Sequence, residues 1–260
     1  MMISRWMMHW SPEQLIIAFI GAFFAGFINA LAGNGSVITL TVLTTLIGLP
    51  GNIANGTNRI GVLMNSVGAL TGFAHKKVEY SLYVKYILPV VIGALAGIAV
   101  ATQVTNDQFM GVFRFLMLLM LIVILVNPKR WLIVRPEKSL IPKWMEWPVF
   151  MILGFYGGFI QMGMGVFFLA VLVLVTRLPM IESNAIKALS VGIFTLIAII
   201  IFSFAGQVVW SIGLVMGAAQ FLGGWSSAHF ASRIPWAAKF AYVILVITVL
   251  LSVVKLFHLV

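Results

Sequence analysis

Long apolar runs follow one another along the whole chain, separated by short polar or glycine-containing interruptions. A run of about 20 apolar residues is what an α-helix needs to cross the hydrocarbon core of a bilayer. The chain does not show the regular apolar–polar alternation that is typical of transmembrane β-strands. The pattern therefore predicts an all-α polytopic membrane protein. The apolar runs occupy residues 13–32, 37–49, 56–75, 83–105, 108–127, 148–162, 166–178, 183–205, 210–231 and 236–257.

Two of these runs, 37–49 and 166–178, are too short to cross a bilayer at 1.5 Å per residue. Each follows a glycine-containing interruption, GNG at 33–35 and GMG at 163–165. Irregular backbone at membrane depth is tolerated only where it is buried in protein or lines a wet cavity. We therefore expect each interruption to break a helix and to precede a short helix or hairpin. The sequence leaves open whether the short segments cross fully or are re-entrant.

The two interruptions belong to an internal repeat with an offset of about 130 residues. In the first half a Leu-Pro pair ends at Pro50 and is followed five residues later by Asn55, and the second half repeats this with Pro179 and Asn184. Each half holds about five helical segments, and a repeat with an odd number of segments must insert upside down relative to its copy. The expected architecture is therefore two inverted repeats within one integrated membrane domain.

The charged residues indicate how the chain is oriented. The 260 residues are 62% hydrophobic and 8% charged, whereas a soluble domain has about 25% charged residues. A basic linker at 128–147 separates a first transmembrane repeat, 1–127, from a second, 148–260. The positive-inside rule predicts that this linker is cytoplasmic. Since the basic residues are explained by orientation, we expect lipid and not nucleic acid as the macromolecular surroundings.

The residue types give no basis for catalysis or metal binding. The chain contains no cysteine, and its histidines and acidic residues form no cluster with the spacing of metal ligands. We therefore expect neither an enzyme, nor a cofactor, nor a metal site. A membrane scaffold is a further alternative, but it would not need matched breaks in both halves.

The helix breaks are the expected binding site. Backbone N–H groups at the start of a helix carry partial positive charge that suits an anion, and glycine allows a ligand to approach closely. Ser36 is expected either to cap the new helix or to contact the ligand. The residues expected to bind substrate are Asn34, Gly35, Ser36, Thr57, Asn58, Arg59, Gly163, Gly165, Asn184 and Lys187.

Arg59 and Lys187 are the expected counter-charges for the anion. In a pseudosymmetric fold the two cations would approach one central site from opposite sides, a guanidinium pairing bidentately and an ammonium acting as a point charge. The alternative is that each side chain snorkels to the headgroups. Glu182 is the expected proton-coupling group, although a carrier without a coupling carboxylate stays open. Further polar candidates, with interhelical hydrogen bonding as their alternative, are Asn29, Asn55, Asn65, Gln161, Ser183 and Gln220.

The sequence around both breaks resembles the sulfite exporter TauE/SafE family. The resemblance rests on GFINALAGNGS at 26–36, GLP at 48–50 and ANGTN at 54–58, with GMG at 163–165 and NAIK at 184–187 as the second copy. It implies a multi-pass carrier of the bacterial inner membrane that exports sulfite or small organosulfonates and is coupled to protons. The family commonly has a further glycine where Asn34 stands, which implies a pocket of different shape.

The leading hypothesis is therefore a secondary transporter that exports a small sulfur-containing anion by alternating access. An anion channel, or a carrier for another small anion such as a carboxylate, is the alternative, because the repeats favour a carrier without excluding a channel. The expected partners are the anion and the bilayer, and assembly into a homo-oligomer is left open by the sequence.

Overall fold

The computed structural model describes residues 10–74, 78–125, 141–230 and 250, and every regular element in these ranges is helical. The all-α prediction is confirmed. The elements are α1 (Pro12–Ala32), α2 (Gly35–Thr41), the π-helix η2 (Val42–Leu46), α3 (Gly51–Phe73), the 3-10 helix η4 (Tyr80–Tyr83), α4 (Val84–Ala101), α5 (Asn106–Leu125), α6 (Lys143–Phe159), α7 (Met164–Ala170), the π-helix η6 (Val171–Val175), α8 (Met180–Phe204) and α9 (Trp210–Phe230).

The outer surface of the helices suits a bilayer. Three helical stretches in the described part of the chain are long and apolar enough to cross a membrane: Pro12–Ala30, Tyr80–Ala101 and Ile181–Phe204. Large apolar side chains project from the bundle, and Phe115 and Phe204 are 66% and 88% exposed. Exposed apolar side chains of this size on many helices would be unfavourable in water, so they indicate contact with lipid.

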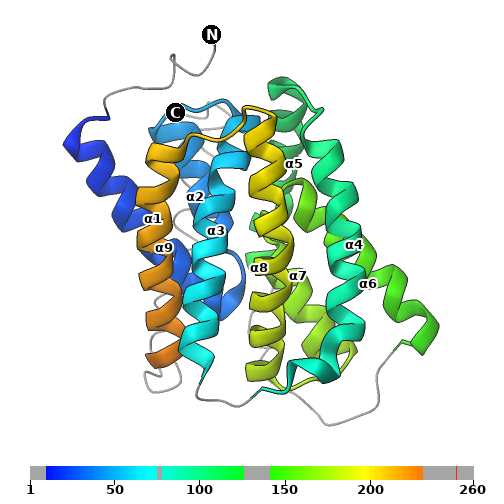
Figure 1. The fold of residues 1–260 in the computed structure, drawn as a ribbon. Helices are drawn as coiled ribbons and strands as arrows, with labels where there is room; N and C mark the ends of the chain where they lie inside the picture. Colours follow the sequence, from blue (N-terminus) through cyan, green and yellow to red (C-terminus); the bar gives the residue numbers. More distant parts are fainter. Residues whose placement is uncertain (1–9, 75–77, 126–140, 231–249, 251–260) are drawn as a thin grey trace.

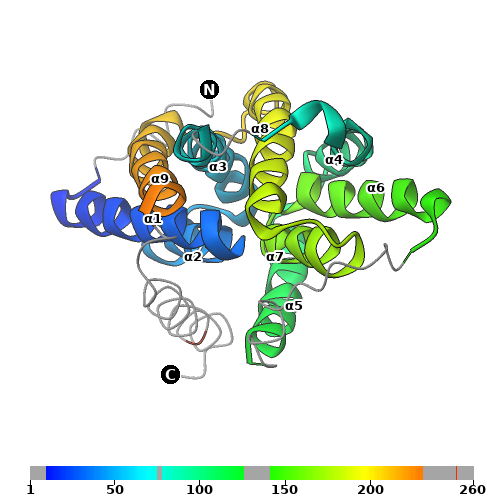
Figure 2. The same cartoon turned by 90° about the horizontal axis from the view of Figure 1, so that it is seen from below.

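Helices α3 and α8 stand together at the centre of the molecule and run in opposite directions (Figure 1). Helices α1 and α6 extend away from this centre toward opposite edges (Figure 2). Helix α4 packs on α6, and α9 packs on α1 and α3. The third long helix of each half, α4 or α9, therefore packs on the first helix of the other half, which interlocks the two halves.

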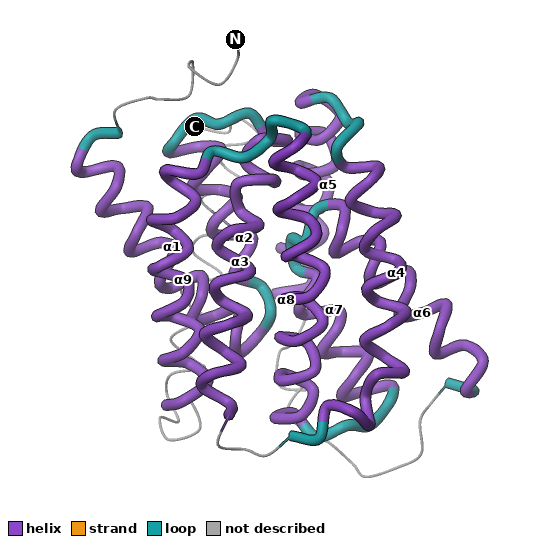
Figure 3. The backbone as a smooth tube through the Cα atoms, viewed as in Figure 1, coloured by secondary structure: helices purple, strands orange, loops and turns teal. Residues whose placement is uncertain are grey.

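Both predicted breaks are present, and their backbone geometry repeats. Gly33 and Gly163 adopt left-handed conformations with φ of 77° and 69°. Each short helix continues into a π-helix, which ends in a hydrogen bond from Leu49 N–H to Leu43 O in the first half and from Leu178 N–H to Leu172 O in the second, both 2.9 Å. Figure 3 shows the two breaks as loops at mid-height, away from the loops at the ends of the bundle.

Glycine lets the interlocked helices approach at backbone contact. A Cβ added at Gly93 of α4 would lie 1.9 Å from Met151 O of α6, and one at Gly154 of α6 would lie 2.0 Å from Val90 O. The pair formed by α1 and α9 is similar, because a Cβ at Gly223 would lie 2.1 Å from Phe23 O. Such small-residue contacts replace the hydrophobic driving force that is missing between helices in lipid.

The second half differs from the predicted boundaries. Helix α6 begins at Lys143, so residues 143–147 of the predicted linker are helical. It ends at Phe159, so the second break begins earlier than the apolar run suggested, and Gln161 takes a left-handed φ of 61°. The rest of the linker up to residue 140 lies outside the described residues, and so does the predicted last segment, 236–257, apart from residue 250.

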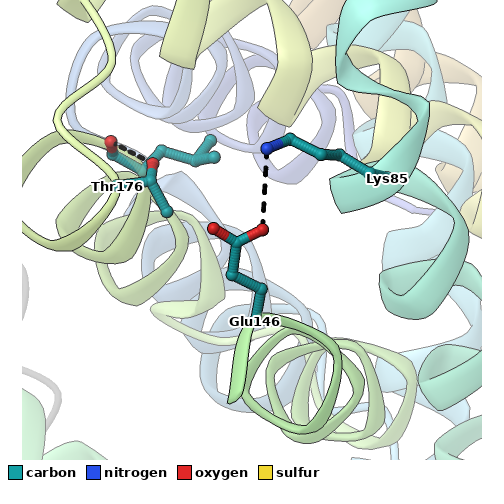
Figure 4. A network of polar contacts seen from close by, with 4 residues as sticks. Lys85, Glu146 and Thr176 are labelled. Atoms are coloured by element: carbon teal, nitrogen blue, oxygen red, sulfur yellow. Dashed lines mark hydrogen bonds and ion pairs between the residues drawn. The ribbon is translucent and has the colours of Figure 1, made fainter. Parts of the chain in front are cut away.

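An ion pair joins α4 to α6 near the ends of these helices. Lys85 Nζ lies 3.6 Å from Glu146 Oε2, and Figure 4 shows the two side chains pointing toward one another with Thr176 close by. The Lys85 side chain is 53% exposed, so the pair contributes little to stability.

Candidate functional site

A cavity of about 20 Å³ with both polar and apolar side chains in its lining lies where the two breaks meet α3 and α8. Its volume matches a water-sized molecule. The lining comes from the end of α1, the start of α2, the second half of α3, the break before α7 and the first half of α8. The lining residues are Asn29, Ala30, Ser36, Val62, Asn65, Ser66, Ala69, Gln161, Met164, Gly165, Asn184, Lys187, Ala188 and Val191.

Lys187 provides the positive charge of this cavity, and its side chain is held by neutral groups. It is 4% exposed, and its ammonium donates to Asn29 O at 2.8 Å, to Ala30 O at 3.5 Å and to Asn184 Oδ1 at 2.9 Å. Asn29 and Ala30 lie in the last turn of α1, whose carbonyls carry partial negative charge. Among the described residues no carboxylate contacts Lys187, and no acidic side chain lines the cavity.

The amides around the cavity are fixed by bonds between helices. Asn29 Nδ2 donates to Asn65 Oδ1 at 2.7 Å. Asn65 Nδ2 donates to Gly26 O at 2.9 Å and to Gln220 O at 3.1 Å. Asn65 therefore joins α3 to α1 and α9 and keeps this wall of the cavity in place.

Arg59 is fully buried but does not line the cavity. Its Nη1 donates to Gly157 O at 2.8 Å, and its Nη2 donates to Gly158 O at 2.6 Å and to Phe159 O at 3.3 Å. The guanidinium thus caps the open carbonyls at the end of α6. It also lies over the Phe202 ring, 5.4 Å from the centroid.

Gln161 separates the Arg59 guanidinium from the cavity. Its Oε1 accepts from Arg59 Nη1 at 2.9 Å, its Nε2 donates to Thr195 Oγ1 at 3.2 Å, and the residue lines the cavity. The prediction that both cations enter one central site is therefore not what this conformation shows. Lys187 is at the cavity, and Arg59 lies beyond Gln161.

The two cations nevertheless have the same kinds of partner. Each bonds to an asparagine on its own helix, Asn55 Oδ1 at 3.4 Å from Arg59 Nη2 and Asn184 Oδ1 at 2.9 Å from Lys187. Each also reaches the last carbonyls of the first helix in the other half, α6 for Arg59 and α1 for Lys187. The corresponding asparagines stand five residues after Pro50 and Pro179.

Four of the predicted substrate-binding residues line the cavity: Ser36, Gly165, Asn184 and Lys187. Gly165 also marks the closest approach of the two breaks, since a Cβ added there would lie 2.5 Å from Gly33 Cα. Ser36 lies inside α2 and does not cap it, because the N-cap is Asn34 and its side chain makes no capping bond.

The other predicted residues have different surroundings. Gly35 packs on α1, where an added Cβ would lie 2.0 Å from Ala25 O. Thr57 Oγ1 accepts from Val209 N–H at 3.0 Å, and Asn58 Oδ1 accepts from Thr39 Oγ1 at 2.6 Å. Gly163 is the N-cap of α7. Glu182 accepts a hydrogen bond from the Tyr83 hydroxyl between α8 and η4, outside the cavity.

Sequence reasoning did not single out Ser66 or Thr195. Ser66 lines the cavity together with Val62, Asn65 and Ala69, which recur at the helical spacing of three and four residues along α3. The same spacing counted from Asn58 gives positions 62, 65, 66 and 69, so this pattern could have identified the face of α3 that lines the cavity.

The fold and the cavity define a helical membrane protein built around a buried cationic site. Its family is shown by sequence comparison: the profile of the family described as sulfite exporter TauE/SafE matches residues 18–256. The chain belongs to this family and is a membrane transporter of the TauE/SafE type.

Several relatives carry similar names. The chain is 29% identical over 241 residues to a "Probable membrane transporter protein ORF9" of Sinorhizobium sp, covering 92% of this chain and 89% of the relative. It is 31% identical to a "Probable membrane transporter protein" of Haemophilus influenzae, covering 81% and 82%. It is 27% identical to "Probable membrane transporter protein YfcA" of Escherichia coli, covering 86% and 81%. No solved structure matches the chain.

Proposed function

We propose that the protein exports a small sulfur-containing anion, sulfite or an organosulfonate, across the bacterial inner membrane by alternating access. The observation that carries this proposal is the buried Lys187 ammonium, which borders the cavity and has no carboxylate partner among the described residues. A buried charge without a counter-charge is costly in a membrane, and a compact anion in the cavity would supply that counter-charge.

The direction of loading follows from the position of the cavity. Its α3 residues, 62–69, lie toward the end of that helix, and its α8 residues, 184–191, lie toward the start. Both helices therefore contribute to the cavity from the lower half of the molecule in Figure 1, and α6 begins at this lower end, directly after the predicted cytoplasmic linker. In our proposal the anion therefore enters from the cytoplasm.

The size of the cavity supports a carrier. An anion of several heavy atoms needs more room than the water-sized volume of about 20 Å³. Binding must therefore be coupled to a rearrangement, and the opposite directions of α3 and α8 fit the inverted repeats by which carriers exchange their two orientations.

Glu182 is proposed to couple proton movement through the contact between η4, which leads into α4, and α8. It accepts from the Tyr83 hydroxyl, so its protonation would change the bond between η4 and α8. In this proposal the Glu182 carboxylate controls this contact between helices and does not bind the anion.

Counterflow into proteoliposomes tests the proposal. Vesicles loaded with unlabelled sulfite or methanesulfonate should take up the labelled anion transiently and with saturation. Lys187→Gln should lose the uptake, whereas the matched Lys85→Gln, on an exposed lysine, should keep it. Flux that rises linearly without counterflow would indicate a channel, uptake of acetate alone would indicate a carboxylate carrier, and normal counterflow in Lys187→Gln would reject this site.

A further inference from the structure

The neighbourhood of Arg59 contains buried hydrogen-bond donors without partners. Asn58 Nδ2 and Arg59 Nε are both buried and make no hydrogen bond, although Asn58 is 2% exposed and Arg59 is fully enclosed. A buried donor that makes no hydrogen bond costs free energy. Because these two donors lie on a buried cationic residue and on the residue before it, we expect them to bind an acceptor in another conformation of the protein. Donors gathered around a positive charge suit an anionic acceptor.

Asn58 has the position in the first half that Lys187 has in the second. Each stands eight residues after the proline that precedes its helix, Pro50 for α3 and Pro179 for α8. Lys187 borders the cavity. Its counterpart Asn58, together with the neighbouring cation Arg59, marks the corresponding place on the other side of the breaks.

The two places are separated along α3. Arg59 and the cavity-lining Ser66 are about 10 Å apart along the helix axis at 1.5 Å per residue. Gln161 lies between them, because its Oε1 holds Arg59 while the residue lines the cavity. Its backbone has a φ of 61°, a left-handed conformation that is uncommon for a non-glycine residue.

We propose that Arg59 forms a second anion station, which takes the same class of compact oxyanion when the side of the protein opposite the cavity opens, and that Asn58, on the neighbouring face of α3, borders the way to it. In that state the Gln161 amide leaves the guanidinium, so one Nη1 N–H becomes available to the anion in addition to the Nε–H, which has no partner here. The anion then passes from Lys187 to Arg59. This inference rests on the proposed function.

Cysteine accessibility tests the second station, and the chain suits the method because it has no cysteine of its own. Single variants Asn58→Cys and Ser66→Cys would be made in the full chain and reconstituted, and an anionic or a cationic methanethiosulfonate would be added to one side at a time. Val37→Cys, fully buried in the core, is the matched unreactive control.

We expect Ser66→Cys and Asn58→Cys to react from opposite sides of the membrane. The anionic reagent should modify Asn58→Cys at least about tenfold faster than the cationic one, because the Arg59 charge concentrates anions. Adding Gln161→Glu, which places a carboxylate against the guanidinium, should remove this preference. If Asn58→Cys does not fold, Thr195→Cys replaces it, since Thr195 contacts Gln161 and lies on α8 one turn beyond the cavity-lining Val191.

The second station is rejected if both cysteines react only from the Ser66→Cys side, if they react no faster than Val37→Cys, or if Gln161→Glu leaves the preference for the anionic reagent unchanged. Failure of the proposed function looks different, because then wild-type protein shows no counterflow of any anion. Normal counterflow with an unreactive Asn58→Cys and Thr195→Cys would remove the second station alone.

Discussion

Lys187 and Arg59 occupy comparable places in the two halves, yet their surroundings differ in how firmly they hold the cation. Helix α1 continues to Ala32, so Asn29 O is already bonded to Gly33 N–H at 2.9 Å when it accepts from Lys187. Helix α6 stops at Phe159, and its last carbonyls receive the Arg59 guanidinium directly. The difference indicates that in this conformation Lys187 is the cation that can exchange its partners. The bonds of Arg59 to α6 keep the side of the protein opposite the cavity closed.

A second comparison points the same way. Glycines on α3 and α9 face each other's helix, and a Cβ added at Gly61 or Gly68 would lie 1.8 Å from Gln220 Nε2 or 2.3 Å from Phe221 O. In the repeat-related pair, α8 and α4, the glycines of the described ranges face other helices: Gly93 faces α6 and Gly192 faces α3. The closely packed pair resists movement, so we expect α4 and α8 to separate first.

Removing the two cations should show the largest difference. Arg59→Gln leaves the carbonyls of Gly157 and Gly158 without their buried charged donor and should lower the free energy of unfolding by about 4 kcal/mol. Lys187→Gln should lower it by about 2 kcal/mol, because Asn29 O keeps its backbone bond. Thermal unfolding in detergent measures both, and equal losses would contradict the comparison.

Filling the contact between the two breaks should be nearly as damaging. Gly165→Leu places its side chain against Gly33 Cα, where even a Cβ would be only 2.5 Å away, and should cost about 3 kcal/mol. Gly111→Leu is the matched control, since a Cβ there meets nothing within 4 Å. A similar unfolding temperature for both variants would show that the breaks do not touch.

The cavity wall gives a smaller effect. Asn65→Ala removes the amide that joins α3 to α1 and α9 and should cost about 2 kcal/mol. Ser66→Ala, on the same face one residue later, should stay within about 0.5 kcal/mol. Chemical denaturation of the two purified variants compares them, and a larger loss for Ser66→Ala would mean that the wall is held differently.

Glu182→Gln should have the smallest effect on stability, below about 1 kcal/mol, because a partly exposed pair contributes little. Its effect should be on coupling. Uptake driven by a pH gradient should fall to the level without a gradient, while counterflow at equal pH continues. Tyr83→Phe keeps the carboxylate and is the control. Unchanged gradient-driven uptake in Glu182→Gln would exclude this residue as the coupling group.

The sequence predicted the helical fold, the two breaks and the short helices after them, because apolar length and paired glycines are local properties. It could not predict the π-turns or the early end of α6. At the site, three consecutive residues show the limit. Thr57, Asn58 and Arg59 point about 100° apart around α3, and so bond to the start of α9, to α2 and to α6. A sequence motif does not contain the rotation of its helix, so only packing decides which member meets the cavity.

The most direct test of the central claim is binding of sulfite and methanesulfonate at Lys187, measured as the ligand-induced shift in unfolding temperature of wild type, Lys187→Gln and Lys85→Gln. A ligand at 100 times its Kd stabilises the folded protein by about 2.7 kcal/mol. The account predicts that shift for wild type and Lys85→Gln and none for Lys187→Gln. An equal shift in all three proteins would contradict it, because the anion would then bind elsewhere.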